Sequence, residues 1–478
     1  MSRYFATSQN IPHAAALQPK LPVLPWLCVF TIAILLVGMD SGRLSAPFGP
    51  SHDGFNAALY MTGGRAILEE GLLASRFGAS SRTPWGDHVV YAHHPPFVYL
   101  ADAVVLAFVS STETAARLPA VFSSFIVLVL VALLMSAIGV SSVSASLGLI
   151  AAFATPMFLM FGAMTEPHTL GLAPMTALTL LWQRARLGAE PSAALLAAVA
   201  ALAVSTSWQA GTFAASVGVA LLIDRRRKVG IAMLAGTATS ATLIGAWLLW
   251  ANYGDLTDFV QRAVHRVGSG ELGRVTFAQM TLRQMQYFSD LFPVGSWLVI
   301  PLAVLGVFDR RTRPLVAVSL GTVLGYALLF KNGAYDHDYW LYCILLPLSL
   351  SAATAADALF RLLSRCAWLR LTPPVLATAL AVLLGISIGQ PSIEQRQRRH
   401  AAMLGAQLRD LSWPSEQRYA YHAFGGRGPT DLMPWVYYYT RRPPFGVDGP
   451  QSVPLGQVLL SLVGGRLVTV PGAKPNTP

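Results

Sequence analysis

Long apolar runs, separated by short polar segments, fill most of this sequence. Each run is close to the roughly 20 residues that an α-helix needs to cross the hydrocarbon core of a bilayer. Spans are expected near residues 22–39, 115–138, 143–162, 192–208, 210–224, 230–250, 292–308, 314–330, 339–357 and 372–390, with a further one that ends at Arg184 and Arg186. The pattern predicts an all-α polytopic membrane protein with about eleven transmembrane helices.

Composition supports this prediction. The chain has 478 residues, of which 54% are hydrophobic and 12% charged, and its mean hydropathy is +0.51, which is too apolar for a soluble globular protein. The net charge of +11 would suit nucleic acid, but the basic residues fall in short clusters between apolar spans, where they set topology. We therefore expect membrane lipids, and not nucleic acid, as partners. The three cysteines form no metal-ligand pattern and are interpreted as small core hydrophobes.

The basic clusters orient the chain. Arg3 and Lys20 precede the first span, so the positive-inside rule places the N-terminus in the cytoplasm. The segment 95–111 is ambiguous because it is apolar but short and carries Asp102. If it spanned the membrane, the basic clusters at 225–228, 309–313 and 361–370 would all face outward. We therefore interpret this segment as interfacial.

Under this topology two large loops and the C-terminal tail lie outside. The loops run from about 40 to 114 and from 252 to 290, and the first holds a juxtamembrane helix that we expect to lie on the membrane surface. The tail combines a helix near 392–411 with strand-like segments near 418–424 and 466–470. The sequence therefore predicts a transmembrane domain over residues 1–390 and a small extracytoplasmic α/β domain over 391–478.

The segment Ser51–Asn56 places Asp53 just beyond the first span. A lone Asp at such a point is commonly a helix cap, which is the structural interpretation. However, many ionisable residues collect on the same predicted outer face, and such groups near hydrocarbon are costly unless they pair or serve a site. They are Asp53, His93, His94, Glu166, His168, Arg262, His265, Arg266, Lys331, Asp336, His337 and Asp338. This convergence favours a functional role for Asp53, although any one histidine taken alone is more typical of a structural residue.

Four segments, taken in order, resemble a known family. They are His52–Gly54 beyond the first span, His93–Phe97 with its paired prolines, Thr114–Pro119, and Asp336–Trp340 at the start of a Leu/Pro-rich span. Over its whole length the chain resembles the GT-C class of membrane glycosyltransferases, especially the protein-O-mannosyltransferase and aminoarabinose-transferase-like branch. The resemblance implies transfer of a sugar from a polyprenyl-phosphate carrier to a lipid, glycan or protein acceptor on the outer side of the membrane, usually with inversion.

The resemblance also assigns roles. Asp53 would be the base that accepts the proton of the acceptor hydroxyl, and cationic groups would stabilise the departing lipid phosphate. Aminoarabinose transferases carry Lys before the paired prolines where this chain has His94, so Arg262, Arg266 and Lys331 are further candidates for the phosphate site. Tyr339 joins the substrate-binding candidates. Gly54 stands where protein mannosyltransferases carry a second acidic residue, which argues against a protein acceptor.

Three questions stay open from the sequence. Glu166 would bind a divalent cation or orient the acceptor, but no ligand spacing is diagnostic of a metal and no cofactor is assigned. A transporter or flippase of lipid-linked sugars is the alternative function, and an inactive relative that acts in assembly is a third. Arginine greatly outnumbers lysine, which is typical of a GC-rich bacterial genome, so the expected location is a bacterial inner membrane. The sugar and the acceptor are not determined.

Overall fold

The structure is a computed structural model of the chain. It describes residues 23–38, 44–49, 51–82, 88–268, 275–292, 304–363, 393–410, 419–422, 438–439, 445–447, 458–463 and 466–471.

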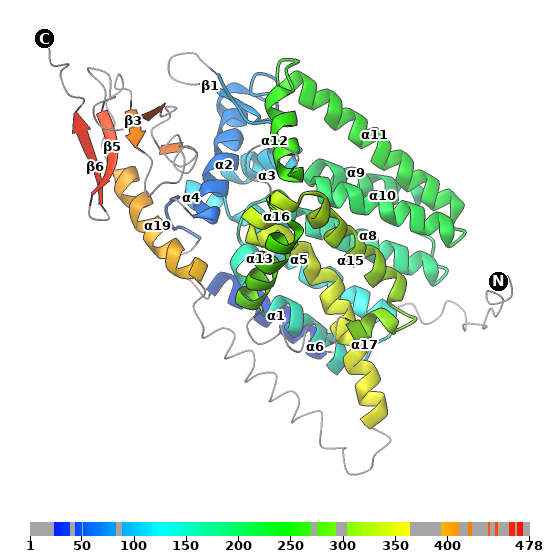
Figure 1. The fold of residues 1–478 in the computed structure, drawn as a ribbon. Helices are drawn as coiled ribbons and strands as arrows, with labels where there is room; N and C mark the ends of the chain where they lie inside the picture. The colour runs from blue at the N-terminus through cyan, green and yellow to red at the C-terminus, as the bar shows by residue number, and fades with distance from the viewer. Residues whose placement is uncertain are drawn as a thin grey trace, which may run out of the picture.

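Helices dominate the described residues (Figure 1). The first half of the chain contains α1 (Val23–Gly38), α2 (His52–Glu70), α3 (Phe97–Leu106), α4 (Thr112–Ala115), α5 (Leu118–Ile138), α6 (Ser142–Phe153), α7 (Pro156–Phe161), α8 (Pro167–Arg186), α9 (Ala193–Thr206) and α10 (Trp208–Ile223). The second half contains α11 (Arg227–Ala251), α12 (Thr257–Val267), α13 (Phe277–Leu291), α15 (Arg313–Leu329), α16 (Lys331–Asp336), the 3₁₀ helix η1 (Asp338–Ile344), α17 (Leu345–Leu363) and α19 (Ile393–Asp410). Most predicted spans thus coincide with helices, whereas most of the one at 292–308 and all of the one at 372–390 lie outside the described residues.

The apolar helices differ in whether they are long enough to cross a membrane. Among the described residues, three continuous helical stretches are long and apolar enough to cross a membrane, namely Thr112–Ile138, Arg227–Ala251 and Asp338–Leu363, and six apolar helices are shorter. The span predicted at 143–162 is broken into α6 and α7, because Pro156 starts a new helix and the residue before a proline avoids helical geometry.

The outer segments depart from the prediction in one respect. α2 is a helix, as expected, but it does not lie on the surface: Asn56 and Met61 are buried, and α2 packs along α3. α3 has ten residues and is about 15 Å long, so it is too short to cross the membrane alone, which agrees with an interfacial position. Asp102 of α3 is fully buried, and burial raises the pKa of its carboxyl well above the usual value.

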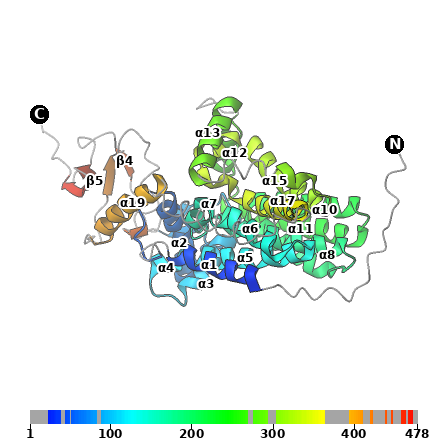
Figure 2. The same ribbon diagram turned by 90° about the horizontal axis from the view of Figure 1, so that it is seen from below.

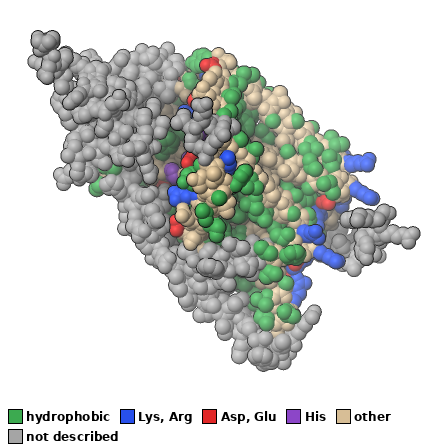
Figure 3. All heavy atoms as spheres, in the orientation of Figure 1, with side chains coloured by type: hydrophobic (Ala, Val, Ile, Leu, Met, Phe, Trp, Pro, Cys, Tyr) green, Lys and Arg blue, Asp and Glu red, His purple; other side chains and the backbone are tan. Residues whose placement is uncertain are grey.

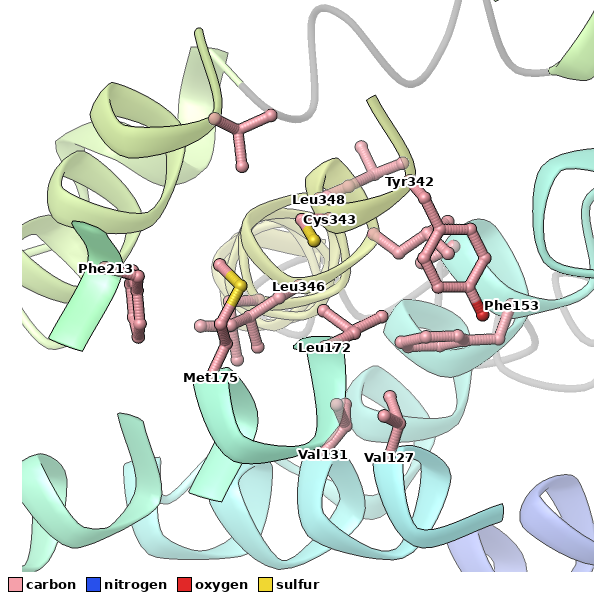
Figure 4. Close-up of a cluster of buried hydrophobic side chains, with 14 of the residues drawn as sticks. Val127, Val131, Phe153, Leu172, Met175, Phe213, Tyr342, Cys343, Leu346 and Leu348 are labelled. Atoms are coloured by element: carbon pink, nitrogen blue, oxygen red, sulfur yellow. The ribbon is translucent and has the colours of Figure 1, made fainter. Parts of the chain in front are cut away.

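The core lies where α5, α6, α8, α10 and α17 meet (Figure 4). Val127 and Leu172 pack there beneath Cys343, which is fully buried, as predicted for a small core hydrophobe. Lipid tails are as apolar as Leu, so close packing stabilises such a core more than water exclusion does. Gly148 shows how close: a Cβ at this position would lie 2.5 Å from the Ser349 carbonyl oxygen of α17.

The helical bundle has two chemically different ends. Arg184, Arg227 and Lys228 are exposed at one end, and basic side chains gather at one edge of the visible face in Figure 3. At that end Arg311 bridges Asp309 and Asp357, with N–O distances of 2.8 and 2.9 Å. The opposite ends of the same helices carry the residues predicted to form a site, and α12 and α13 stand out from the bundle there (Figure 2). The separation of the two ends is what the positive-inside rule predicts.

Strands occur in two small sheets. β1 (Ser80–Arg82) pairs antiparallel with β2 (His88–Val90) in the first outer loop. β3 (Tyr419–His422), β4 (Phe445–Val447), β5 (Val458–Val463) and β6 (Arg466–Pro471) form a sheet in the order β4-β3-β5-β6, in which only β5 and β6 are antiparallel. The α19 helix and the strands at 419–422 and 466–471 match the elements predicted for the tail.

Candidate active site

Asp53 lies in the first turn of α2 but does not cap it. The cap is Ser51, which has an extended backbone and whose Oγ accepts a hydrogen bond from the Gly54 N–H at 3.1 Å. Asp53 is 3% exposed, and a carboxylate in this turn interacts favourably with the positive end of the helix dipole. The capping interpretation of Asp53 is therefore wrong, and its carboxylate is available for another role.

Arg117 is the partner of Asp53. Its Nε and Nη2 donate to Asp53 Oδ2 at 3.2 and 3.0 Å, and its side chain is 1% exposed. Its Nη1 donates to the carbonyl oxygens of Leu44, Ala46 and Glu113 at 3.2, 2.8 and 3.1 Å. A buried ion pair of this kind is tolerated only when such additional hydrogen bonds satisfy both groups.

Sequence reasoning missed Arg117 as a site residue. Arg117 lies within the segment Thr114–Pro119, which carries part of the family resemblance, but the resemblance assigns it no role. The available signal was its place at the outer end of a long apolar helix, where a buried cation needs an acidic partner.

Glu166 and His168 form a second buried pair. Glu166 caps α8, since its Oε2 accepts a hydrogen bond from the His168 N–H at 2.6 Å. Its two carboxylate oxygens also lie 3.0 and 2.9 Å from His168 Nδ1. The other ring nitrogen, Nε2, has no hydrogen-bond partner among the described residues, and the ring packs against Tyr326, Tyr339 and Trp340. The described residues contain no group of three His, Cys, Asp or Glu side chains placed to hold a metal ion.

His93 and His94 sit in the turn before α3 and are both buried. His93 Nε2 lies 2.9 Å from Asp258 Oδ2, yet burial and the nearby Arg262 lower the pKa of His93 to about 4. Burial, and then the charge of Arg266, lower the pKa of His94 well below its usual value. Both rings are therefore neutral at pH 7, and His94 would gain the predicted pH-dependent charge only in acid.

The predicted cations of α12 differ in their surroundings. Arg262 donates from Nε to both carboxylate oxygens of Asp258, each at 3.1 Å, and its side chain is half exposed. His265 is exposed to solvent. Arg266 has its guanidinium 5.9 Å from the ring centre of Trp340 and makes no ion pair within the described part of the chain. Arg266 is thus the cation on this helix that a ligand's anion can approach without displacing a carboxylate.

The residues predicted on α16 and η1 separate into two groups. Asp338 and Tyr339 join the site: Asp338 Oδ1 is 3.3 Å from His52 Nδ1, and the Tyr339 ring lies 5.6 Å from the ring of His52. His337 stacks on Trp340 at 5.9 Å. Lys331 and Asp336 form the second group, which does not contact the site. The Lys331 Nζ lies over Phe277 at 5.2 Å, and Asp336 is exposed at the end of α16.

A cavity of about 710 Å³ lies beside this cluster. Its wall is mostly apolar, and the polar groups come from α12, from the His93 turn and from hydroxyls of α10 and α15. The lining residues are His93, Trp208, Thr212, Ser216, Phe259, Arg262, Ala263, Arg266, Ala317, Val318, Gly321, Thr322, Gly325, Tyr326, Leu329 and Phe330. The lining of α15 from Ala317 to Phe330 corresponds to about 20 Å of helix.

Gly321 and Gly325 line this cavity instead of packing two helices together. Glycines four residues apart are typical of close helix contacts, but a Cβ built at either position would meet no described atom within 4 Å. The two glycines keep one wall of the cavity open, and ring contacts continue from Tyr326 through His168 and Tyr339 to His52, the neighbour of Asp53.

Neither a protein-family model nor a curated protein sequence matches the chain. Solved structures do match, and at 11 to 14% identity the likeness is one of fold. The helices of the described residues that are long and apolar enough to cross a membrane agree with a multi-pass membrane protein.

Among these structures, the chain is similar to ArnT from Cupriavidus metallidurans. The crystal structure of ArnT bound to undecaprenyl phosphate matches with a TM-score of 0.58 and 14% identity over 89% of this chain and 86% of that one. The apo structure of ArnT matches with a TM-score of 0.54 and 14% identity, over 89% and 85%. The archaeal oligosaccharyltransferase AglB from Archaeoglobus fulgidus, in complex with an inhibitory peptide and a dolichol-phosphate, matches with a TM-score of 0.52 and 11% identity over 89% of this chain and 64% of that one.

Proposed function

We propose that this protein is a membrane glycosyltransferase that moves a sugar from a polyprenyl-phosphate carrier to an acceptor hydroxyl on the extracytoplasmic side. The observation that carries the proposal is the buried Asp53–Arg117 pair, which lies in a GT-C fold and is joined through His52 and Tyr339 to the cavity beneath Arg266. The ArnT and AglB structures, which hold lipid phosphates, support this function by their fold. Nothing in the described part of the chain favours the transporter alternative.

The cavity is where we place the donor. An apolar wall along α15 suits a prenyl chain, and Arg266 at its outer part suits the phosphate, because a guanidinium makes charge-assisted hydrogen bonds to phosphate oxygens. His93 and His94 would contact the donor as neutral hydrogen-bonding groups. We propose secondary roles in binding for Arg262, Asp338 and Tyr339. We propose no direct contact for Lys331, which lies over Phe277, or for the exposed His265 and Asp336.

The reaction follows from these positions. Asp53 accepts the proton of the acceptor hydroxyl while that oxygen forms a bond to the anomeric carbon. The bond from the anomeric carbon to the phosphate oxygen breaks, and the polyprenyl phosphate leaves with its charge stabilised by Arg266. A single displacement of this kind inverts the anomeric centre. We assign Glu166 and His168 together to acceptor orientation, because the Glu166 carboxylate is occupied by His168 and, within the described residues, belongs to no group of three possible metal ligands.

We further propose the arrangement of the whole chain. Residues 1–390 form the catalytic transmembrane domain with its site outside, and residues 391–478 form a small extracytoplasmic domain. The expected setting is a bacterial inner membrane, with cell-envelope glycan, lipid or protein as the acceptor.

The test compares Asp53→Asn with Ser51→Ala in nanodiscs. Each protein is given radiolabelled undecaprenyl-phosphate sugars and an envelope extract as acceptor source, and transferred label is counted. Asp53→Asn should lose transfer at least about 100-fold, roughly 3 kcal/mol of barrier, yet bind undecaprenyl phosphate as the wild type does. Ser51→Ala removes the helix cap, so it should cost about 1 kcal/mol of stability and keep transfer. Near-normal transfer by Asp53→Asn would refute the base role, and a wild type that transfers no sugar from any donor would refute the function.

A further inference from the structure

The C-terminal part of the chain contacts the segment that holds Arg117. Tyr439 makes two hydrogen bonds there: its hydroxyl donates to Glu113 Oε1 at 3.0 Å and accepts from the Phe48 N–H at 2.9 Å. These bonds join residues 391 and 326 positions apart in the sequence. Tyr439 therefore ties the tail both to the segment 44–49 and to α4.

The segment 44–49 in turn supplies ligands to Arg117. The carbonyl oxygens of Leu44 and Ala46 accept from Arg117 Nη1, and the Arg117 guanidinium lies 5.6 Å from the ring centre of Phe48. Glu113 takes part as well, because its backbone carbonyl accepts from the same Nη1 at 3.1 Å. Both residues that bond the Tyr439 hydroxyl thus also contact the Arg117 guanidinium, Phe48 through its ring and Glu113 through its backbone carbonyl.

Packing supports these hydrogen bonds. The Phe48 ring meets Tyr438 edge-on at 4.8 Å and lies 5.9 Å from the ring of Tyr439. α19 comes so close to this segment that a Cβ at Gly405 would overlap the Phe48 carbonyl oxygen. Leu404 and Leu408 of α19 are buried in the same apolar cluster as residues of α2 and α4. The segment is therefore enclosed between the tail and the site.

Charge also favours this arrangement. Glu113 is 7% exposed, and a buried carboxylate is costly unless hydrogen-bonded or paired. Tyr439 and Arg409, whose Nη1 lies 3.6 Å from Glu113 Oε1, provide those partners. Burial and the charge of Glu113 raise the pKa of the Tyr439 hydroxyl, so it stays protonated and able to donate.

We propose that Tyr439 and Glu113 are positioning residues for sugar transfer: they fix the segment 44–49, which holds Arg117, and Arg117 orients the Asp53 carboxylate. This inference rests on the proposed function. It gives the C-terminal tail a part in the reaction through a residue that acts by way of Arg117. A base displaced by about 1 Å can lose rate by two orders of magnitude, so a hydroxyl remote from the reacting atoms can matter.

The experiment compares Tyr439→Phe with the matched control Tyr438→Phe in the full chain. Each variant loses one hydroxyl and keeps the ring, but within the described residues only the Tyr439 hydroxyl bonds Phe48 and Glu113. Tyr439→Phe should lower kcat for sugar transfer at least about tenfold while KM for the undecaprenyl-phosphate sugar stays within error of wild type. Hydrogen exchange at the Phe48 amide should be faster in Tyr439→Phe alone. In an Arg117→Lys background, Tyr439→Phe should cost little more, because both changes act on one path.

The outcomes separate two failures. If the wild type transfers sugar but both Tyr variants keep its kcat, the positioning inference fails and the proposed function stands. The inference also fails if Tyr439→Phe lowers the unfolding midpoint and changes kcat and KM together, or if its effect simply adds to that of Arg117→Lys. A wild type that transfers no sugar refutes the proposed function itself, whatever hydrogen exchange reports at Phe48.

Discussion

At the scale of single residues, Arg266 and Arg262 are one helical turn apart on α12 but differ in their partners. Arg262 is engaged by Asp258, whereas Arg266 has no carboxylate partner among the described residues. We expect Arg266→Ala to weaken binding of undecaprenyl phosphate by about 10- to 100-fold, which corresponds to the loss of one or two charge-assisted hydrogen bonds.

Arg262→Ala is the matched control for this prediction. It removes the same charge from the same helix, but a charge already neutralised by Asp258, so its effect should be several-fold smaller. Thermal shift on titration with undecaprenyl phosphate measures both. Equal losses in the two variants would mean that general positive charge, and not the Arg266 position, attracts the phosphate.

The buried histidines predict sensitivity to acid. Burial lowers the pKa of His93 to about 4 and that of His94 well below 6.5, the value expected in the unfolded chain. Below pH 6.5 these histidines therefore bind protons in the unfolded chain but not in the folded chain. The free energy of unfolding is highest above pH 6.5 and decreases as the pH falls toward 4.

The measurement is the thermal unfolding midpoint between pH 7.5 and 4.5. The midpoint should fall with acid in the wild type and fall less steeply in His94→Gln, which cannot take up a proton. Parallel curves for the two proteins would show that His94 does not contribute to the acid sensitivity.

At the scale of elements, two glycine substitutions distinguish a loss of cavity volume at α15 from a general loss of helix stability. Gly321→Leu places a side chain into the proposed prenyl site, whereas Gly245→Leu places the same side chain into open space on α11. Neither substitution meets an atom within 4 Å at its Cβ, so both should fold. Gly321→Leu should reduce transfer from an undecaprenyl-phosphate sugar at least about tenfold by raising KM, since Leu would occupy volume that the chain needs.

The comparison can fail in two informative ways. Wild-type KM in Gly321→Leu would place the prenyl chain elsewhere. A similar loss in Gly245→Leu would show that the bundle does not tolerate a larger residue in either helix.

At the scale of the whole molecule, the two charged ends of the bundle predict its orientation. Gln261 of α12 and Arg310 in the basic turn before α15 are both exposed, so access to either depends on the side of the membrane and not on burial. Thr312, two residues further on, is fully buried and would not report a side. In intact cells, Gln261→Cys should react with an impermeant maleimide and Arg310→Cys only after permeabilisation. The reverse pattern would place the candidate site in the cytoplasm.

The sequence alone determined the membrane class and most of the helices, and it offered candidates for a site. Hydrophobic length identifies a spanning helix because the bilayer thickness is fixed, and basic clusters mark one face because they resist translocation. The order of four short motifs along the chain carried the resemblance to the GT-C class. These are local properties, so they can be deduced without knowledge of contacts.

Only the tertiary structure decided the partners. No local pattern pairs Asp53 with Arg117, 64 positions away, or Tyr439 with Phe48 across 391. Periodicity placed α2 on the membrane surface because its apolar and polar residues alternate at near-helical spacing. In the structure, small residues such as Gly63 and Gly64 let α3 pack closely against α2. The spacing of Gly321 and Gly325 is typical of a helix-packing motif, yet sequence shows only that the residues are small and not what faces them. Whether such a residue meets a helix or a cavity depends on neighbours far away in the chain.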